Sequence, residues 1–150
     1  MAEKIAIGSD HRGFKLKQSL KVLLESQGKT VEDVGAFSEE SADYPEFARN
    51  VGQRVSRRSC DRGILICGSG IGMSITANKF PRVRAALCHD LHTAEMCRRH
   101  NDANVLVLGE SVGEDLARDM VKLWLATPFE GGRHQKRLDI IQKIEQENFK

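Results

Sequence analysis

A cysteine followed by three alternating glycines is the segment with the clearest capacity for chemistry. It reads Ile64-Leu65-Ile66-Cys67-Gly68-Ser69-Gly70-Ile71-Gly72, an apolar run typical of a buried strand, then a turn and helix-forming residues. Backbone N–H groups in such a turn, together with the helix dipole, favour an anion. A thiol at a helix N-terminus ionises more easily, and its pKa falls from about 8.5 towards a range of about 3.5–7.5. Cys67 and the turn therefore indicate a general base beside an oxyanion hole.

Other functions of a glycine-rich turn fit these residues less well. The spacing differs from the G-x-G-x-x-G pattern of dinucleotide-binding domains, and no Gly-Lys-Ser/Thr sequence follows as in a nucleotide P-loop. A cysteine phosphatase needs an arginine six residues after the cysteine, where this chain has Met73. Cys67 could instead be a buried strand-end cysteine that packs as a small hydrophobic side chain. The turn itself is predicted to bind an anion without catalysing phosphoryl transfer.

Polar and basic residues elsewhere could bind the rest of a ligand. Asp10 and His11 follow the first predicted strand, at the edge where open α/β sheets bind ligands. Arg133 and Arg137 are four residues apart, so they can share a helix face and bind one phosphate. A solvent-exposed basic helix start is the alternative. His100, taken alone, is typical of a surface residue at a helix C-terminus.

A metal site is not predicted. The sequences Cys88-His89-x-x-His92 and Cys97-x-x-His100 contain residue types that bind metals, but their spacing matches no standard zinc site. The four cysteines form no Cys-x-x-Cys pair. We therefore expect free thiols in a reducing compartment.

The composition is typical of one globular domain. The chain has 150 residues, 40% hydrophobic and 29% charged, which is enough for a single domain spanning residues 1–150 with its own core. A net charge of +2 and an aromatic content of 5% give no support for a nucleic-acid partner. The apolar runs are too short for a membrane span or a signal peptide, so we expect no membrane partner and a cytoplasmic location.

Strand-like and helix-like segments alternate along the chain. Predicted strands cover residues 4–9, 30–34, 64–66, 83–88 and 104–108. Predicted helices begin near Phe14, Tyr44, Ile71, Leu91 and Leu116, and a final helix carries Leu138, Ile141 and Ile144. This alternation predicts an α/β fold, a three-layer αβα Rossmann-like domain with a five-stranded parallel sheet. The last helix lies beyond the fifth strand, and we expect it to extend toward a partner subunit.

Residue types and spacing also predict where helices end and which faces they bury. Gly28 suits the position that closes the first helix, and Pro45 suits the first turn of the second. Four apolar residues predict the inner face of the helix after the fifth strand, namely Leu116, Met120, Leu123 and Trp124.

Taken together and in order, several motifs resemble those of one enzyme family. They are Gly8-Ser9-Asp10-His11, Asp43-Tyr44-Pro45, Gly63-Ile64-Leu65-Ile66-Cys67-Gly68-Ser69-Gly70-Ile71-Gly72-Met73-Ser74-Ile75, Ala77-Asn78-Lys79, Arg98-Arg99-His100-Asn101-Asp102-Ala103-Asn104 and Glu130-Gly131-Gly132-Arg133-His134. Through almost its whole length the chain resembles the type B ribose-5-phosphate isomerase family, which includes allose-6-phosphate and galactose-6-phosphate isomerases.

The resemblance implies a cofactor-free isomerisation of ribose 5-phosphate to ribulose 5-phosphate through a cis-enediolate. By the same resemblance, Cys67 is the base that moves a proton between C2 and C1. Ser69 and His100 would assist opening of the furanose ring. The enediolate oxygen would be held by backbone amides of the turn, which includes Gly68, Gly70, Ile71 and Gly72.

The resemblance also assigns residues that bind the substrate. Asp10 would bind sugar hydroxyls, and the phosphate would be held by His11, Arg133 and Arg137. Tyr44 and Asn101 lie within the matching motifs and are further substrate-binding candidates. Active sites of the family lie at a dimer interface, so the resemblance implies a homodimer or a dimer of dimers. His100 and the arginines could then act in a different subunit from Cys67.

The chain departs from the family pattern at two places, and the second of them leaves the substrate preference open. Ser69 stands where many relatives carry threonine, although it keeps the hydroxyl. The loop Gly109-Glu110-Ser111-Val112-Gly113 is one residue shorter than usual and lacks an arginine often found there. An isomerase of a six-carbon aldose phosphate, such as allose 6-phosphate, is therefore one alternative. The other is a non-catalytic module that binds phosphosugars or nucleotides, which predicts that Cys67 is dispensable.

Overall fold

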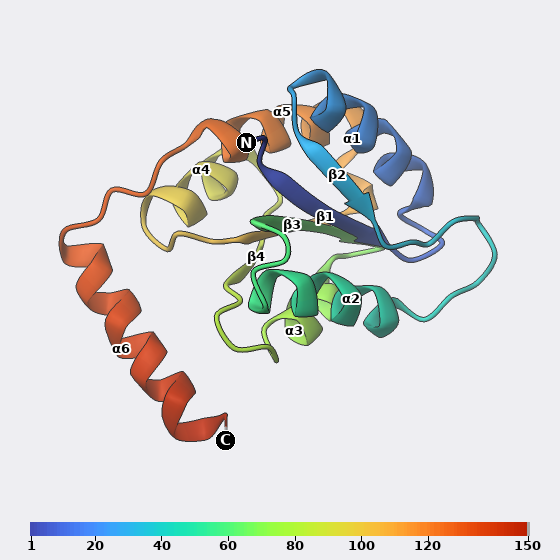
Figure 1. Ribbon diagram of the computed structural model, residues 1–150. Helices are drawn as coiled ribbons and strands as arrows, with labels where there is room; N and C mark the ends of the chain where they lie inside the picture. Colours follow the sequence, from blue (N-terminus) through green and yellow to red (C-terminus); the bar gives the residue numbers. More distant parts are fainter. Residues whose placement is uncertain (150) are drawn as a thin grey trace.

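Five parallel strands form one sheet in the order β2-β1-β3-β5-β4 (Figure 1). The computed structural model describes residues 1–149. The strands are β1 (Lys4–Ser9), β2 (Thr30–Asp33), β3 (Arg62–Cys67), β4 (Ala85–Leu87) and β5 (Val105–Gly109). Every neighbouring pair is parallel, which confirms the predicted sheet. The chain leaves β1 in one direction and β3 in the other, so the ligand-binding crevice of such a sheet is expected at the carboxyl ends of these two strands.

Helices cover both faces of the sheet, which confirms the predicted three-layer fold. Figure 1 shows α1 (Phe14–Ser26), α4 (Leu91–Arg99) and α5 (Glu114–Ala126) on one face. On the other face lie α2 (Tyr44–Ser56) and α3 (Ile71–Ala77). The resulting architecture is an α/β, Rossmann-like domain.

Successive residues of a central strand pack into different layers. In β3, Ile64 and Ile66 belong to the core beneath α1, α4 and α5, whereas Leu65 and Cys67 belong to the core beneath α2 and α3. This alternation follows from the pleat of a β-strand, whose side chains point to opposite faces in turn. It places the side chain of Cys67 on the face covered by α2 and α3.

The predicted helix signals near Gly28 and Pro45 act as expected. Gly28 has φ +77° after the end of α1, and the N–H of Lys29 donates to the carbonyl of Leu24 at 3.1 Å. This is the Schellman arrangement, in which a left-handed glycine closes a helix. Pro45 lies in the first turn of α2, where a backbone N–H would have no acceptor inside the helix, so proline loses no hydrogen bond there.

Some boundaries and faces differ from those predicted. β4 is limited to Ala85–Leu87 rather than residues 83–88, since it is an edge strand that pairs only with β5. α3 ends at Ala77. The buried stripe of α5 consists of Ala117, Met120, Val121 and Trp124. Leu116 and Leu123 are half-buried at the edge of this stripe, because α5 is rotated to pack its small Ala117 inward.

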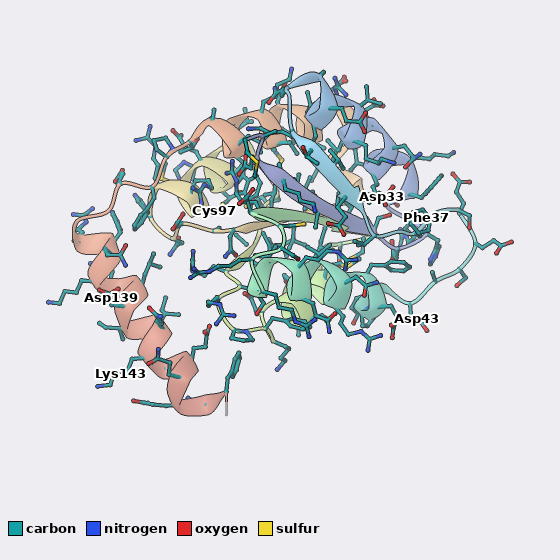
Figure 2. All side chains as sticks on the ribbon, viewed as in Figure 1. Asp33, Phe37, Asp43, Cys97, Asp139 and Lys143 are labelled. Atoms are coloured by element: carbon teal, nitrogen blue, oxygen red, sulfur yellow. The ribbon has the colours of Figure 1, made fainter. Side chains whose placement is uncertain are left out.

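A buried ion pair anchors the loop that follows β2. The Nζ atom of Lys17, a fully buried residue of α1, lies 2.6 Å from Oδ2 of Asp33. Oδ1 of Asp33 accepts a hydrogen bond from the backbone N–H of Gly35 at 2.9 Å. Figure 2 shows Asp33 and Phe37 close together where β2 leads into this loop. The loop therefore leaves the sheet in a fixed direction and can position residues near the strand ends.

The last helix, α6 (Arg133–Asn148), stands apart from the three layers (Figure 1). Figure 2 places Asp139 and Lys143 on it, far from Asp33 and Phe37. Its buried side chains are His134 and Leu138, whereas Ile140, Ile141 and Ile144 are exposed. Among residues 1–149 we find no helix with the length and apolar character needed to span a membrane.

Candidate active site

The turn after β3 holds Cys67 against backbone donors. Gly70 adopts φ +85°, and its N–H donates to the Sγ atom of Cys67 at 3.2 Å. Its positive φ favours glycine, and a Cβ atom here would also lie 3.1 Å from the backbone carbonyl carbon of Leu108. The N–H of Ile71 donates to Oγ of Ser69 at 3.2 Å. The thiol and the hydroxyl are thus both fixed by the backbone of one turn.

Two side chains from other elements lie directly against the glycines of this turn. A Cβ atom on Gly72 would collide with the ring of Tyr44, the first residue of α2. A Cβ atom on Gly68 would lie 2.8 Å from Nη1 of Arg12. The glycines therefore allow Tyr44 and Arg12 to approach the backbone next to Cys67.

Residues after β1 line the same edge of the sheet. The N–H of Asp10 donates to the carbonyl of Ile66 at 3.3 Å, which joins the end of β1 to β3. Oδ1 of Asp10 accepts hydrogen bonds from the N–H groups of Arg12 (3.0 Å) and Gly13 (3.1 Å). Asp10 is therefore buried at the start of α1 with a fixed orientation.

His11 is held by the loop between β2 and α2. Its Nδ1 atom lies 3.1 Å from the backbone nitrogen of Ala42 and 3.3 Å from the carbonyl oxygen of the same residue. The shorter contact favours Nδ1 as the acceptor, which places the proton on Nε2. The structure therefore brings nine predicted binding or catalytic residues to the carboxyl ends of the strands, namely Asp10, His11, Tyr44, Cys67, Gly68, Ser69, Gly70, Ile71 and Gly72.

A second cluster forms around His100, the residue that follows α4. The rings of His100 and His134 are stacked, with centroids 4.3 Å apart and planes at 14°. Oε1 of Glu130 lies 3.6 Å from Nε2 of His134 and 3.9 Å from Nε2 of His100. Burial lowers the pKa of His134, and the charges of His100 and Arg133 lower it further. Both imidazoles are thus directed at one carboxylate.

The two clusters lie at opposite ends of the strands. The carbonyl oxygen of Asn101 accepts a hydrogen bond from Nε of Arg84 at 3.2 Å, and Arg84 directly precedes β4. His100 and Asn101 therefore lie near the amino ends of the strands, whereas Cys67 lies at a carboxyl end. Arg133 and Arg137 are exposed on α6, and the N–H of Glu130 donates to the carbonyl of Arg99 beside His100. Within one chain, Cys67 therefore does not share a site with His100, Asn101, Arg133 and Arg137.

The second cluster also contains the residue types of a metal site. Ligand atoms of His100, Glu130 and His134 all lie within 4.8 Å of one another. Arg99 lies 3.7 Å from the same carboxylate, and Arg133 is next to His134. These positive charges oppose a divalent cation, so the cluster is better suited to an anion.

Three features of these clusters were not predicted from the sequence. Glu130 and His134 are four residues apart, a spacing that could have indicated their contact. Arg12 directly follows His11, but its position against Gly68 depends on the fold. The contact between Ala42 and His11 joins residues 31 positions apart and leaves no local signal.

A parallel α/β sheet with a thiol in a glycine-rich turn at its carboxyl edge is the arrangement that the sequence resemblance predicts. A family model described as Ribose/Galactose Isomerase matches residues 5–141. The chain therefore belongs to the ribose/galactose isomerase family and is an enzyme of the aldose–ketose isomerase class.

Individual relatives are similar over nearly their whole lengths. Ribose-5-phosphate isomerase B of Escherichia coli K12 is 47% identical over 145 residues, which cover 96% of this chain and 97% of that protein. The structure of ribose-5-phosphate isomerase B from Clostridium thermocellum has a TM-score of 0.94 and 50% identity, covering 96% of this chain and 98% of that one. The enzyme from Mycoplasma genitalium, solved with bound ribulose-5-phosphate, has a TM-score of 0.94 and 40% identity, with 99% of each chain covered.

Proposed function

We propose that this protein interconverts ribose 5-phosphate and ribulose 5-phosphate through a cis-enediolate, without a cofactor. The observation that carries the proposal is the position of Cys67. Its sulfur accepts an N–H bond from the turn at the carboxyl edge of the sheet, beside Asp10 and His11. The names of the relatives from Escherichia coli and Clostridium thermocellum, and the ligand of the Mycoplasma genitalium enzyme, support a five-carbon substrate.

Cys67 acts as the base in this mechanism. Its thiolate removes the proton from C2 of the open-chain aldose, and the negative charge moves onto the C1 carbonyl oxygen. The proton is then returned to C1 while the proton of the O2 hydroxyl passes to O1, which leaves the carbonyl at C2. The N–H of Gly70 stabilises the thiolate that starts the reaction. A positioned general base contributes roughly 10²–10⁴ to the rate.

Backbone amides of the turn stabilise the enediolate. Gly72 is the second residue of α3, so its N–H has no acceptor inside the helix and is free for a substrate oxygen. Each donor placed where the negative charge develops is worth about 10²–10³ in rate. Ser69, an exposed residue whose Oγ is fixed by the N–H of Ile71, assists ring opening.

The remaining groups at this edge bind the sugar and its phosphate. Both hydrogen bonds to Asp10 end on Oδ1, which leaves Oδ2 for sugar hydroxyls. His11, with Nδ1 occupied by Ala42, uses Nε2 to bind the phosphate. The ring of Tyr44 forms one wall of the site over Gly72.

The complete site requires two copies of the chain. His100 and Asn101 lie at the opposite end of the strands from Cys67. Ring opening and substrate binding at Cys67 are therefore assisted by His100 of the partner subunit and Asn101 of the partner subunit. Arg133 and Arg137 of the partner subunit complete the phosphate site. The exposed isoleucines of α6 provide an apolar surface that can pack against that subunit. The active assembly is therefore a homodimer or a dimer of dimers.

NMR in D₂O tests the reaction directly. The protein is incubated with ribose 5-phosphate, allose 6-phosphate and galactose 6-phosphate, and deuterium incorporation is followed at C1 of the ketose and C2 of the aldose. We expect exchange in ribose 5-phosphate above the other two. Faster exchange in allose 6-phosphate would replace the proposed substrate with a six-carbon sugar. No exchange in any of them would support a non-catalytic binding module.

A further inference from the structure

Arg12 is a cation at the carboxyl edge of the sheet that the mechanism above does not use. Its guanidinium lies against Gly68, the residue that follows Cys67. A Cβ atom on Gly68 would lie 2.8 Å from Nη1 and 3.3 Å from Nε of Arg12. The guanidinium is therefore next to the backbone that leads from the thiol into the turn.

The backbone and a neighbouring carboxylate hold Arg12 in this position. Its N–H donates to Oδ1 of Asp10 at 3.0 Å. In the side chain, Nη2 donates to Oε1 of Glu110 at 3.2 Å. Glu110 begins the short 3₁₀ turn η1 (Glu110–Val112) that follows β5. Since an arginine has five N–H donors, this single bond leaves most of them for a ligand.

The contact with Glu110 orients the guanidinium without binding it tightly. The side chain of Arg12 is 60% exposed, and exposed ion pairs of this kind contribute little to stability. The loop Gly109–Gly113 contains Glu110 but no lysine or arginine of its own. Arg12 is therefore a cation that the fold places beside this loop.

The guanidinium opens onto a cavity that His11 also lines. This cavity has a volume of about 360 Å³, and the carboxylates of Glu39, Glu110 and Glu114 line it together with the cations of Arg12 and Lys15. Another cation on its wall, Lys15, has a different partner, since its Nζ lies 3.5 Å from Oε1 of Glu39. A phosphate group that enters from the side of His11 meets Arg12 as the next donor, and a guanidinium can bind two phosphate oxygens at once.

We propose that Arg12 is a phosphate-binding residue, contributed by the same subunit as Cys67 and acting beside His11 to select phosphorylated sugars. The inference rests on the proposed function for the identity of the sugar, but not for the anion. In the substrate complex the phosphate takes the place of the Glu110 carboxylate on the guanidinium.

Inorganic phosphate provides a test that needs no turnover. Its dissociation constant is measured by ³¹P NMR for the wild type, Arg12→Ala, Arg12→Lys and the control Lys15→Ala. We expect Arg12→Ala to weaken phosphate binding by about 10- to 100-fold, the usual effect of losing hydrogen bonds to a charged group. Arg12→Lys restores part of the affinity, because lysine keeps the charge but not the planar pair of donors. Lys15→Ala leaves it within about twofold.

Kinetics and a second variant separate phosphate binding from a structural role. With ribose 5-phosphate, Arg12→Ala should raise KM by a similar factor and change kcat little. Glu110→Gln removes the competing carboxylate, so phosphate should bind as tightly as in the wild type or more tightly. If Arg12 only braces the loop, both variants weaken binding alike, which would overturn the proposal. An unchanged phosphate dissociation constant in Arg12→Ala would overturn it as well. Absence of turnover in the wild type would instead contradict the proposed function, while the phosphate measurement still decides the role of Arg12.

Discussion

The sulfur of Cys67 differs from that of Cys60 in what surrounds it, although both cysteines are buried. Cys67 accepts an N–H bond, whereas Cys60 donates its thiol proton to Oε2 of Glu32 at 3.2 Å. Burial raises the pKa of Cys60 to about 12, and the neighbouring Glu32 carboxylate adds to this effect. Cys60 therefore remains a thiol at neutral pH and provides a matched control for Cys67.

Cys67→Ala should abolish isomerisation and leave substrate binding largely intact. Removal of the general base is expected to reduce kcat by about 10²–10⁴, and any residual turnover comes from the backbone amides, which the variant keeps. Turnover is measured with ribose 5-phosphate and binding by calorimetry. Cys60→Ala should keep kcat close to the wild-type value. Normal turnover in Cys67→Ala would contradict the mechanism and favour the binding module.

The pair formed by Glu32 and Arg54 should make stability depend on acid pH. Nε of Arg54 donates to Oε1 of Glu32 at 2.8 Å, and this bond is the main cause of the fall in the pKa of Glu32 from 4.5 to about 2. Since the pKa is lower in the folded state, the stabilisation is complete above about pH 4.5 and is lost as the pH falls towards 2.

Glu32→Gln tests this linkage. After allowance for solvent screening at a one-third exposed site, we expect a loss of roughly 1 kcal/mol at pH 7. Urea denaturation of both proteins between pH 7 and pH 2.5 measures the difference, which should shrink below pH 4.5. A difference that stays constant with pH would show that the carboxylate charge contributes nothing.

At the scale of elements, the β3–α3 turn depends on a backbone shape that only glycine supplies. Gly70 and Gly28 share a left-handed φ, at +85° and +77°. They differ in their surroundings, because a Cβ atom on Gly70 meets Leu87 and the backbone of Leu108, whereas one on Gly28 meets nothing within 4 Å. The two positions therefore separate backbone strain from steric collision.

Gly70→Ala should lower both stability and kcat, while Gly28→Ala should lower stability alone. Left-handed strain costs about 1–2 kcal/mol in each variant, and the collision at Gly70 adds to it and displaces the turn that holds Cys67. Thermal unfolding and steady-state kinetics of the two variants provide the comparison. Equal kcat values in Gly70→Ala and the wild type would show that the turn tolerates displacement.

At the scale of the whole molecule, the distance between the two clusters makes subunit mixing informative. Cys67→Ala and His100→Asn should each be inactive as homo-oligomers. In a mixed dimer, one of the two sites combines an intact Cys67 with an intact His100 from the other chain.

Co-expression of the two variants should therefore restore roughly one quarter of the wild-type activity, as expected for random pairing in a two-fold dimer. The activity of the mixture is compared with that of each variant alone, and size-exclusion chromatography gives the assembly size. A mixture as inactive as its components would place Cys67 and His100 in the same subunit's site. The cytoplasmic location, the single domain and the absence of a cofactor stay predictions.

Signals carried by neighbouring residues were sufficient for the fold and for the glycine turn that holds Cys67. The apolar run before Cys67, the alternating glycines, Gly28 and Pro45 each act through backbone geometry over a few residues, so the strands, the turn and most helix ends could be predicted. The edge position of β4 and the rotation of α5 could not, because both depend on which elements pack beside them.

The sequence by itself determined the alternation of strands and helices, the thiol in a glycine turn, and Asp10 and His11 at a strand end. Only the tertiary structure decided that Arg12 lies against Gly68, that Ala42 fixes His11, and that His100 stacks on His134 at the far edge from Cys67. Local patterns are set by dihedral preferences and hydrophobic period, which act within a few residues. Contacts between distant residues depend on the order of the strands in the sheet and on which face each helix covers. No short segment of the sequence determines the strand order or the position of a helix.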